Sequence, residues 1–246
     1  RNIRTVTKEI KREKQHENAV IDYCGVGKSS TINALFGTSL KVSHTVAGTL
    51  IPTKIPIKGK SIKGQKGELI LHDMPGLGED IDKDKEYENA YRKIIAQCDV
   101  AVWVISASDR RITEDQRAIR NIVGPANRKV LDRMIIGMNK IDLIHPNNWI
   151  QDVNLPSIEQ ENNLSKKIKD VREKMIKSCP GLTEERIIGY SAKQRYRLQE
   201  LFGAMLHACP KERAWVLDSR QKIDSFWDCV DPKLKGLVEA GTKGGI

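Results

Sequence analysis

The sequence predicts an α/β fold with a mainly parallel β-sheet and helices on both of its faces. Short apolar segments alternate along residues 19–209 with segments in which apolar residues have helical spacing, and this alternation is typical of βαβ units. Residues 100–106 are an almost continuous apolar run, as expected for a strand buried on both faces of a parallel sheet. The chain has 246 residues, of which 39% are hydrophobic, which suits one such domain with appendages.

The predicted strands are short segments bounded by polar or Gly-rich stretches. Residues 51–57 alternate apolar and polar side chains, which favours an edge strand that is buried on one face. The other strands are more uniformly apolar, and one of them ends at Asp73. In chain order, the sequence predicts strands at residues 19–21, 51–57, 67–72, 100–106, 134–138 and 186–190.

The predicted helices carry apolar residues three and four positions apart. The first helix has a natural stop at Gly37, and the second places Tyr91, Ile94 and Ile95 on one face. The fourth is long and highly charged, with a sparse apolar stripe formed by Ile158, Leu164, Ile168, Val171 and Ile176. In chain order, helices are predicted at residues 29–36, 86–97, 113–123, 157–178 and 198–209.

Two segments flank the predicted domain. Residues 1–18 are basic and indicate either a weakly amphipathic helix or a solvated arm. Residues 210–246 open with a predicted helix at about 211–230, whose apolar stripe favours either packing against the domain or contact with a partner or membrane surface. The Gly-rich end is expected to be disordered. Because the chain begins with Arg1 rather than Met, we expect it to be a fragment.

The composition narrows the functional classes. The formal net charge is +10, which is compatible with an acidic partner such as RNA, a ribosome or an anionic membrane surface, and equally with a basic protein that has no such partner. Nothing in the sequence points to DNA. The five cysteines are far apart and the histidines lack metal spacing, which favours reduced thiols in the cytoplasm over a zinc site. No apolar run approaches the roughly 18 residues of a membrane span.

The most informative segment is Cys24-Gly25-Val26-Gly27-Lys28-Ser29-Ser30, which has the Gly-Lys-Ser core of a phosphate-binding loop. Backbone N–H groups of such a loop wrap the β-phosphate of a nucleotide, and the serine hydroxyl, here Ser29, binds Mg²⁺. Lys28 reaches the β- and γ-phosphates and supplies positive charge where the transferred phosphoryl group becomes more negative. The other predicted nucleotide-binding residues of this segment are Gly25, Val26, Gly27 and Ser30.

Further residues are predicted to respond to the γ-phosphate and the metal. Asp73 ends an apolar strand, from which a carboxylate reaches the Mg²⁺ shell, usually through water. Gly76 can offer its backbone N–H to the γ-phosphate because no side chain blocks the approach. By its resemblance to the switch loops of nucleotide-dependent switch proteins, the loop after the first helix should supply a threonine that binds Mg²⁺ while the γ-phosphate is present: Thr49 is our choice, Thr45 and Thr53 are alternatives, and each can instead be an ordinary loop or strand residue. The predicted catalytic residues are Lys28, Thr49 and Gly76.

Two later segments address the base. Asn139-Lys140-Ile141-Asp142 follows an apolar strand, and the Asp142 carboxylate can accept N–H bonds from guanine N1 and N2. Adenine has an acceptor at N1 and would leave this buried acid unpaired. Lys140 is expected to lie along the ring or to brace the phosphate loop. In Ser191-Ala192-Lys193, the Ala192 N–H can donate to guanine O6. Together with the preceding segments, this order predicts a site for GTP and GDP.

The chain resembles the TRAFAC-class GTPases of the Era/TrmE type. The segments that carry the resemblance are Ser29-Ser30-Thr31-Ile32-Asn33-Ala34-Leu35-Phe36-Gly37 and Asp73-Met74-Pro75-Gly76-Leu77-Gly78. They are especially similar to the YfjP-like subgroup, often labelled a 50S ribosome-binding GTPase domain. The resemblance covers about residues 19–209. It implies a three-layer P-loop NTPase sandwich, GTP binding, Mg²⁺ dependence and slow hydrolysis.

Three residues depart from the pattern of the family. Asp22 stands where the phosphate loop usually opens with Gly, and a negative charge near the phosphates can weaken binding unless the side chain turns away. Gly25 replaces an Asn that helps several relatives to hold an activating K⁺ ion. Leu77 stands where Ras-like GTPases carry a water-positioning Gln, so the attacking water must be held by backbone, by another side chain or by a partner.

These observations leave two functional classes open. The first is a GTPase that hydrolyses GTP slowly and acts as a conformational switch. The second is a non-hydrolysing GTP-binding or scaffold module, a hypothesis motivated by Asp22 and Leu77. The partner is open as well: the basic surface suggests RNA or the ribosome, and the C-terminal helix suggests a membrane surface or a homodimer contact.

Overall fold

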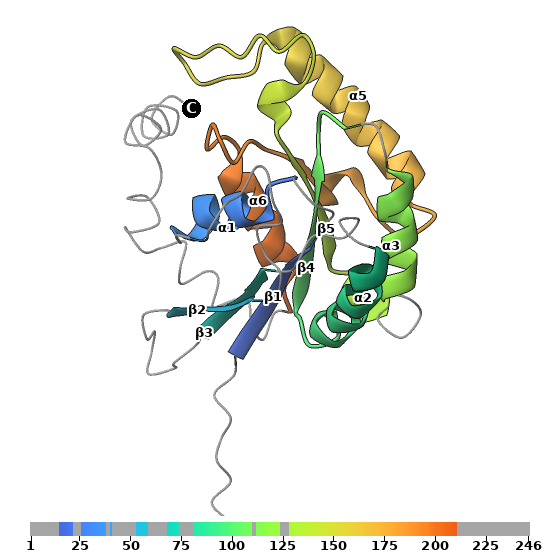
Figure 1. Ribbon diagram of the computed structural model, residues 1–246. Helices are drawn as coiled ribbons and strands as arrows, with labels where there is room; N and C mark the ends of the chain where they lie inside the picture. The colour runs from blue at the N-terminus through green and yellow to red at the C-terminus, as the bar shows by residue number, and fades with distance from the viewer. Residues whose placement is uncertain are drawn as a thin grey trace, which may run out of the picture.

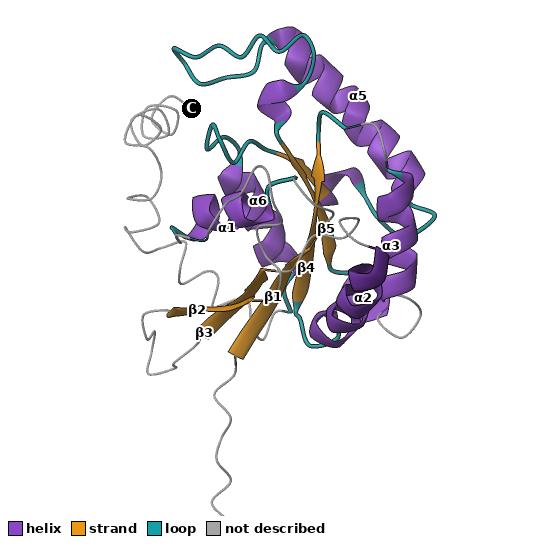
Figure 2. Cartoon of the chain, viewed as in Figure 1, coloured by secondary structure: helices purple, strands orange, loops and turns teal. Residues whose placement is uncertain are grey.

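Six strands form a sheet at the centre of the described structure, and helices pack on both of its faces (Figures 1 and 2). The predicted N-terminal arm up to residue 14 lies outside the described residues, as do the predicted C-terminal helix and the Gly-rich end. The computed structural model describes residues 15–21, 26–37, 40, 53–58, 68–73, 81–109, 112–123 and 128–210.

The strand order in the sheet is β2-β3-β1-β4-β5-β6. Neighbouring strands run parallel except at one edge, where β2 pairs antiparallel with β3. The predictions of a mainly parallel sheet and of an edge strand after the first helix are confirmed. The strands are β1 (Gln15–Ile21), β2 (Thr53–Lys58), β3 (Glu68–Asp73), β4 (Val100–Ser106), β5 (Met134–Asn139) and β6 (Ile187–Gly189).

β1 begins at Gln15, earlier than the start predicted at residue 19. In the described sheet its first residues pair with β3, and pairing with β4 begins only at Asn18, opposite Val100. A strand end with one neighbour is less enclosed than a strand between two, so polar residues are tolerated there. The hydropathy of residues 15–18 therefore gave no strand signal.

The helices form two layers. In Figure 1, α1 and α6 lie on one side of the sheet and α2, α3 and α5 lie on the other. α2 begins and ends earlier than predicted, and the single-turn helix α4 was not predicted. No helix of the described residues is long and apolar enough to cross a membrane. The helices are α1 (Lys28–Phe36), α2 (Ile81–Ile95), α3 (Thr113–Val123), α4 (Arg128–Leu131), α5 (Ile158–Met175) and α6 (Leu198–Ala208).

β4 separates two buried apolar clusters, because successive side chains of a strand point to opposite faces. Ala101, Trp103 and Ile105 belong to the cluster beneath α2, α3 and α5, whereas Val102 and Val104 belong to the cluster beneath α1 and α6. Trp103 is fully buried, and its indole Nε1 donates to Oδ1 of Asp115 on α3 at 2.9 Å. The polar end of this large side chain is thereby satisfied inside the core.

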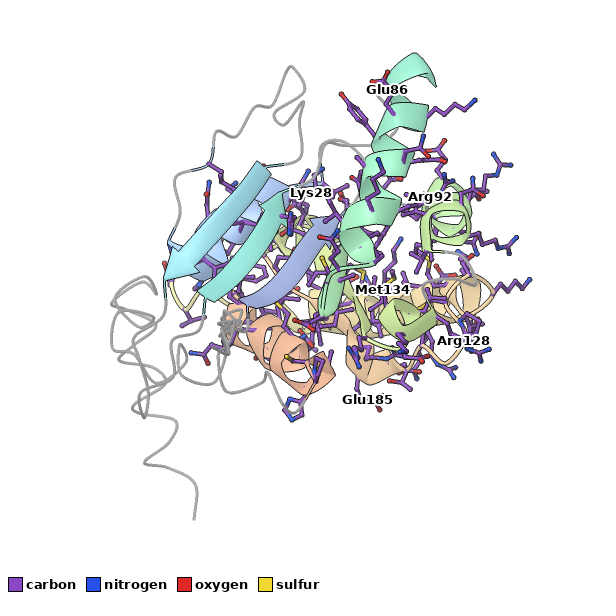
Figure 3. The ribbon with its side chains drawn as sticks, turned by 90° about the horizontal axis from the view of Figure 1, so that it is seen from below. Lys28, Glu86, Arg92, Arg128, Met134 and Glu185 are labelled. Carbon is purple, nitrogen blue, oxygen red and sulfur yellow. The ribbon has the colours of Figure 1, made fainter. Side chains whose placement is uncertain are left out.

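Arg92 connects two helices on the same face. Its Nε donates to the carbonyl oxygen of Asn121 at 2.9 Å, and Figure 3 shows the side chain extending from α2 toward α3. The same guanidinium forms an ion pair with Glu88 at 3.1 Å. Because both charged groups reach solvent, this ion pair adds little to stability. The bond to the carbonyl of Asn121 is a direct polar link between α2 and α3, which also share a buried apolar cluster.

The apolar stripe of α5 differs from the prediction at both ends. Leu164 and Val171 are buried, whereas Ile158 is 84% exposed and Ile176 is 36% exposed. Ile158 precedes Leu164 by six positions, which at 3.6 residues per turn places it on another side of the helix. Met175 takes the buried position near the end of the helix. The stripe that faces the sheet is therefore shorter than predicted.

Candidate nucleotide-binding site

The predicted site segments meet at the carboxyl edge of the parallel strands, the edge at which open α/β sheets bind ligands. β1 leads toward the phosphate loop, and Val20 near its end pairs in register with Asp73, the last residue of β3. β5 ends at Asn139, and Ser191 follows β6 after one residue. Segments far apart in the sequence therefore reach the same edge.

The described part of the phosphate loop ends where α1 begins. Gly27 is the N-cap of α1 with φ of 98°, in the left-handed region that favours glycine. Lys28 follows as the first residue of α1 and is only 7% exposed; Figure 3 shows it beside the strands of the sheet. Ser29 and Ser30, half-buried, complete the first turn. The amino end of the helix and the lysine are thus at the edge where the strands end.

Asn139 connects the phosphate loop with both predicted base segments. Its Nδ2 donates to the carbonyl oxygen of Val26 at 2.9 Å. Its Oδ1 accepts from the backbone N–H of Lys140 at 2.8 Å and from that of Ala192 at 3.0 Å. The side chain is 3% exposed, so these bonds are shielded from water. One buried amide therefore holds the site's segments together.

The bond from Asn139 to Val26 also orients a backbone donor of the phosphate loop. In a trans peptide the C=O and N–H groups point in opposite directions. Because the carbonyl of Val26 points at Asn139, the N–H of Gly27 in the same peptide points away from it. This direction leaves that N–H available to a phosphate on the other side, as a phosphate loop requires.

Asp142 and Ser191 form the second connection within the site. The hydroxyl of Ser191 donates to Oδ1 of Asp142 at 2.6 Å and accepts from the N–H of Gln194 at 3.0 Å. Asp142 is 4% exposed and Ser191 is fully buried. Lys140 has φ of 64°, and the 3₁₀ turn that it opens, η2 (Ile141–Leu143), contains Asp142. A carboxylate accepts several hydrogen bonds, so Ser191 orients Asp142 and leaves it capacity for a ligand.

Gln160 supports the same turn from α5. Its Nε2 donates to the carbonyl oxygens of Ile144 at 3.0 Å and Asp142 at 3.3 Å, and its side chain is 1% exposed. Ser157 caps α5 and forms a capping box with Gln160, in which each side chain bonds the other's backbone N–H. The start of α5 and the Asp142 turn are therefore tied together by a side chain that sequence reasoning did not assign to the site.

The Ala192 N–H points to a different acceptor from the one expected. The Ser191-Ala192-Lys193 motif predicts that this N–H donates to guanine O6, but here it donates to Oδ1 of Asn139 in a buried contact. A backbone N–H has one proton, so an O6 contact from Ala192 requires this bond to be shared or broken. Lys193, the last residue of the segment, is exposed. Ser191 and Tyr196 close the loop through an antiparallel bridge.

Several predicted residues lie outside the described part of the chain. They include the candidate switch residues Thr49 and Gly76. The residues that depart from the family pattern, together with Cys24, also lie there. Asp73 is placed by the backbone of β3. The predicted site residues outside the described residues are Gly25, Thr49 and Gly76, and the departures are Asp22, Gly25 and Leu77.

The structure adds residues that the motifs did not mark. Gln160 had a local signal, since Ser157 and Gln160 have the spacing of a capping box. Tyr190 and Thr31 had none. Thr31 lies on α1 just after the Gly-Lys-Ser core, Tyr190 directly precedes Ser191, and both are fully buried. Their side-chain oxygens are 2.8 Å apart, and a contact across this sequence distance has no local pattern.

Comparison with known proteins agrees with this geometry. Residues 17–140 match the family described as 50S ribosome-binding GTPase. The chain belongs to this family. The described segments are those of a GTP-binding GTPase domain, and the resemblance inferred from the motifs is confirmed.

The relatives extend beyond this chain. The uncharacterized protein YfjP of Escherichia coli (strain K12) is 29% identical over 188 residues, which are 76% of this chain and 60% of YfjP. The chain thus spans about three-fifths of the length of YfjP, and the same share of YkfA from the same organism.

Two solved structures share the fold. An Era variant of Aquifex aeolicus bound to GDP·AlF4⁻ has a TM-score of 0.62 at 23% identity, covering 80% of this chain and 58% of that chain. Era in complex with MgGDPNP and nucleotides 1506–1542 of 16S ribosomal RNA has a TM-score of 0.59 at 22% identity, covering 80% of this chain and 58% of that chain. At these identities the likeness establishes the fold.

Proposed function

We propose that this domain binds GTP together with Mg²⁺, hydrolyses it slowly to GDP and phosphate, and acts as a conformational switch. The observation that carries the proposal is the buried side chain of Asn139, which bonds Val26 of the phosphate loop and both base segments. A nucleotide laid along this edge contacts the phosphate loop at one end and the Asp142 turn at the other. The residues that would contact the base and those that would contact the phosphates are thus connected through the hydrogen bonds of Asn139.

Hydrolysis requires charge stabilisation and positioning from the protein. Water attacks the γ-phosphorus, the bond to the β–γ bridging oxygen breaks, and negative charge grows on the leaving GDP. Lys28, in the first turn of α1, supplies positive charge to the β- and γ-phosphates. The N–H of Gly27, directed away from Asn139, supplies a fixed donor. At the base, Asp142 accepts from guanine N1 and N2 while Ser191 holds it in place.

The proposed metal residues fit Mg²⁺, which prefers hard oxygen donors. Ser29 offers a hydroxyl in the first turn of α1, and Asp73 ends β3 beside Val20, close to where β1 enters the phosphate loop. When bound there, Mg²⁺ neutralises charge on the β- and γ-phosphates. Thr49 is the proposed third ligand in the GTP state.

The switch part of the proposal concerns Thr49 and Gly76. Both would contact the Mg²⁺–γ-phosphate end of GTP and lose this contact after hydrolysis, which changes their segments between the two states. Leucine cannot orient water by hydrogen bonding, so Leu77 supports a slow intrinsic rate.

The test begins with fluorescent GTP, GDP and ATP analogues titrated into the pure protein, with and without Mg²⁺. We expect guanine-selective binding that weakens when Mg²⁺ is removed. Single-turnover hydrolysis of GTP should then exceed the rate without protein and be lost in Lys28→Ala. Binding without hydrolysis would favour the non-hydrolysing module instead, and absence of guanine selectivity would overturn the proposal.

We propose RNA as the partner. The formal net charge of +10 supports an anionic partner, and Era, whose fold this chain shares, has been solved with 16S ribosomal RNA. The affinity for a ribosomal RNA fragment should fall steeply as salt rises, because phosphate contacts release counterions. Binding to anionic vesicles that is lost without residues 211–246, with no RNA binding, would point to the membrane surface instead.

A further inference from the structure

A chain of hydroxyl groups joins the base side of the site to the phosphate loop. The hydroxyl of Thr31 donates to the carbonyl oxygen of Gly27 at 2.8 Å, and the hydroxyl of Tyr190 lies 2.8 Å from the Thr31 oxygen. The Thr31 backbone N–H also donates to the Gly27 carbonyl at 2.9 Å. Tyr190 and Thr31 are both fully buried. The bond between the two hydroxyls is therefore buried, and the bond to the Gly27 carbonyl is partly buried.

The direction of these bonds follows from the number of protons. A threonine hydroxyl has one proton and two acceptor lone pairs. Because Thr31 gives its proton to the carbonyl of Gly27, Tyr190 must donate to Thr31. The chain therefore runs from the Tyr190 hydroxyl to the Thr31 hydroxyl to the Gly27 carbonyl. Donation from Tyr190 polarises the Thr31 hydroxyl and strengthens its bond to Gly27.

The last acceptor in this chain belongs to the peptide that joins Gly27 to Lys28. Its C=O is held by Thr31, so its N–H, which belongs to Lys28, points the opposite way. The preceding peptide is fixed in the same manner through Val26 and Asn139. Two successive N–H groups at the end of the phosphate loop are thus oriented by side chains from α1 and from the base side of the sheet.

Gly137 on β5 leaves space for the tyrosine. A Cβ atom at Gly137 would lie 3.2 Å from Cε1 of Tyr190 and 3.3 Å from Cγ1 of Val102, both tighter than ordinary contact. The Tyr190 ring therefore lies directly over a glycine of the strand that ends at Asn139. The backbone of Tyr190 is fixed as well, because its N–H donates to the carbonyl oxygen of Met138 and its carbonyl oxygen accepts from the N–H of Ile141.

We infer that Tyr190 is a positioning residue for the phosphate loop: through Thr31 it fixes the Gly27–Lys28 peptide for contact with the β-phosphate of the nucleotide. The inference rests on the proposed function in that it names the nucleotide, but the positioning of this peptide can be measured without one. Tyr190 is adjacent to Ser191, which holds Asp142, so the base side and the phosphate loop share a rigid connection.

The first test uses the nucleotide-free protein. Amide hydrogen exchange at Thr31, whose N–H bonds the Gly27 carbonyl, should be faster in Tyr190→Phe and Thr31→Val than in the wild type. Thr31→Ser keeps the hydroxyl and should restore slow exchange. Tyr91→Phe is the matched control, because Tyr91 is an equally buried tyrosine in the apolar cluster on the other face of the sheet.

The second test compares GDP with GMP, which lacks the β-phosphate. Tyr190→Phe should lower the affinity for GDP by about fivefold, the effect of one lost buried hydrogen bond. The affinity for GMP should stay nearly unchanged. The double variant Tyr190→Phe/Thr31→Val should match Thr31→Val alone, because both substitutions break the same chain.

The outcomes separate this inference from the proposed function. Unchanged exchange at Thr31 in Tyr190→Phe, equal weakening of GDP and GMP, or the same effects in Tyr91→Phe would each overturn the positioning role. Faster exchange at Thr31 together with a selective loss of GDP affinity supports it. If the wild type binds no guanine nucleotide, the proposed function fails, and the exchange measurement alone decides whether Tyr190 fixes the Gly27–Lys28 peptide.

Discussion

A Cβ atom on Gly27 would lie 2.6 Å from Nδ2 of Asn139. Gly27 therefore cannot gain a side chain without moving the amide that joins the site's segments. Its φ of 98° adds a backbone penalty of roughly 1–2 kcal/mol for any L-residue. We expect Gly27→Ala to lower the free energy of unfolding by about 2 kcal/mol or more and to weaken GDP by more than about tenfold.

Gly203 in α6 provides the control for this substitution. Nothing lies within 4 Å of a Cβ built there, and alanine is favoured over glycine inside a helix by about 1 kcal/mol. Gly203→Ala should therefore be neutral or stabilising and should leave GDP affinity unchanged. Urea unfolding and GDP titration measure both effects, and equal behaviour of the two variants would contradict the steric argument.

Asp142→Asn should change which base the site prefers. An amide offers one acceptor and one donor, which suits the N1–H and the O2 carbonyl of xanthine, whereas guanine presents donors at both positions. We expect the affinity for GDP to fall by roughly a hundredfold, because charge-assisted hydrogen bonds are lost. Xanthosine diphosphate should bind to this variant more tightly than it binds to the wild type. Competition titration measures both ligands. Equal weakening of the two would argue against a direct contact between Asp142 and the base.

Gln160→Leu should destabilise the domain at the Asp142 turn. The leucine has a similar volume but removes the buried bonds to the carbonyls of Asp142 and Ile144. The Ile144 carbonyl keeps the N–H of Asn147 at 2.8 Å, so we expect a cost of roughly 1–2 kcal/mol. Glu159→Leu is the control, because Glu159 is exposed on the same helical turn. The urea midpoint should fall for Gln160→Leu with an unchanged m-value. A fall of the same size for Glu159→Leu would mean that the loss does not arise from the buried bonds.

Asp115 should make stability depend on pH in a direction unusual for a carboxylate. Burial raises the pKa of its carboxyl from 3.8 to about 6, although the hydrogen bond from Trp103 acts to lower this pKa. The folded protein then binds this proton more tightly than the unfolded chain. Its contribution to stability is full below about pH 4 and is lost as pH rises through about 6.

Asp115→Asn removes this dependence and keeps an oxygen acceptor for Trp103. The variant should be more stable than the wild type by up to about 3 kcal/mol at pH 7.5, and this difference should vanish near pH 4. Urea unfolding at both pH values measures it, with the exposed Asp152→Asn as the control. A constant difference between Asp115→Asn and the wild type across this range would show that the carboxyl does not titrate as described.

The fold was predictable where the pattern of apolar residues was unambiguous. β4 and α3 have the predicted bounds, because a continuous apolar run and a regular helical stripe each favour one structure. α4 was missed because a single turn has no periodicity to detect. β1 was predicted too short because hydropathy does not register a strand end that has one neighbour. In α5, Ile158 was wrongly predicted to belong to the buried stripe, because it is apolar but lies on another side of the helix.

The convergence of the site segments was predictable for a topological reason, since the carboxyl ends of parallel strands share an edge. The connections between the segments were not. The carbonyl of Val26 is held by Asn139 and that of Gly27 by Thr31, and the first of these partners is distant in the sequence. Motif spacing indicates which residues face a nucleotide, but the side chains that hold those residues in place become visible only in three dimensions.

The two edge strands of the sheet affect whether the protein aggregates at high concentration. Within the described sheet, β2 closes one edge with Pro56 inside the strand, and β6 closes the other with only three residues. An unpaired strand edge can recruit a strand from another molecule, but a proline without an N–H and a very short strand each oppose this. The sheet is therefore a poor template for intermolecular strand addition, which protects the domain from β-aggregation at high concentration.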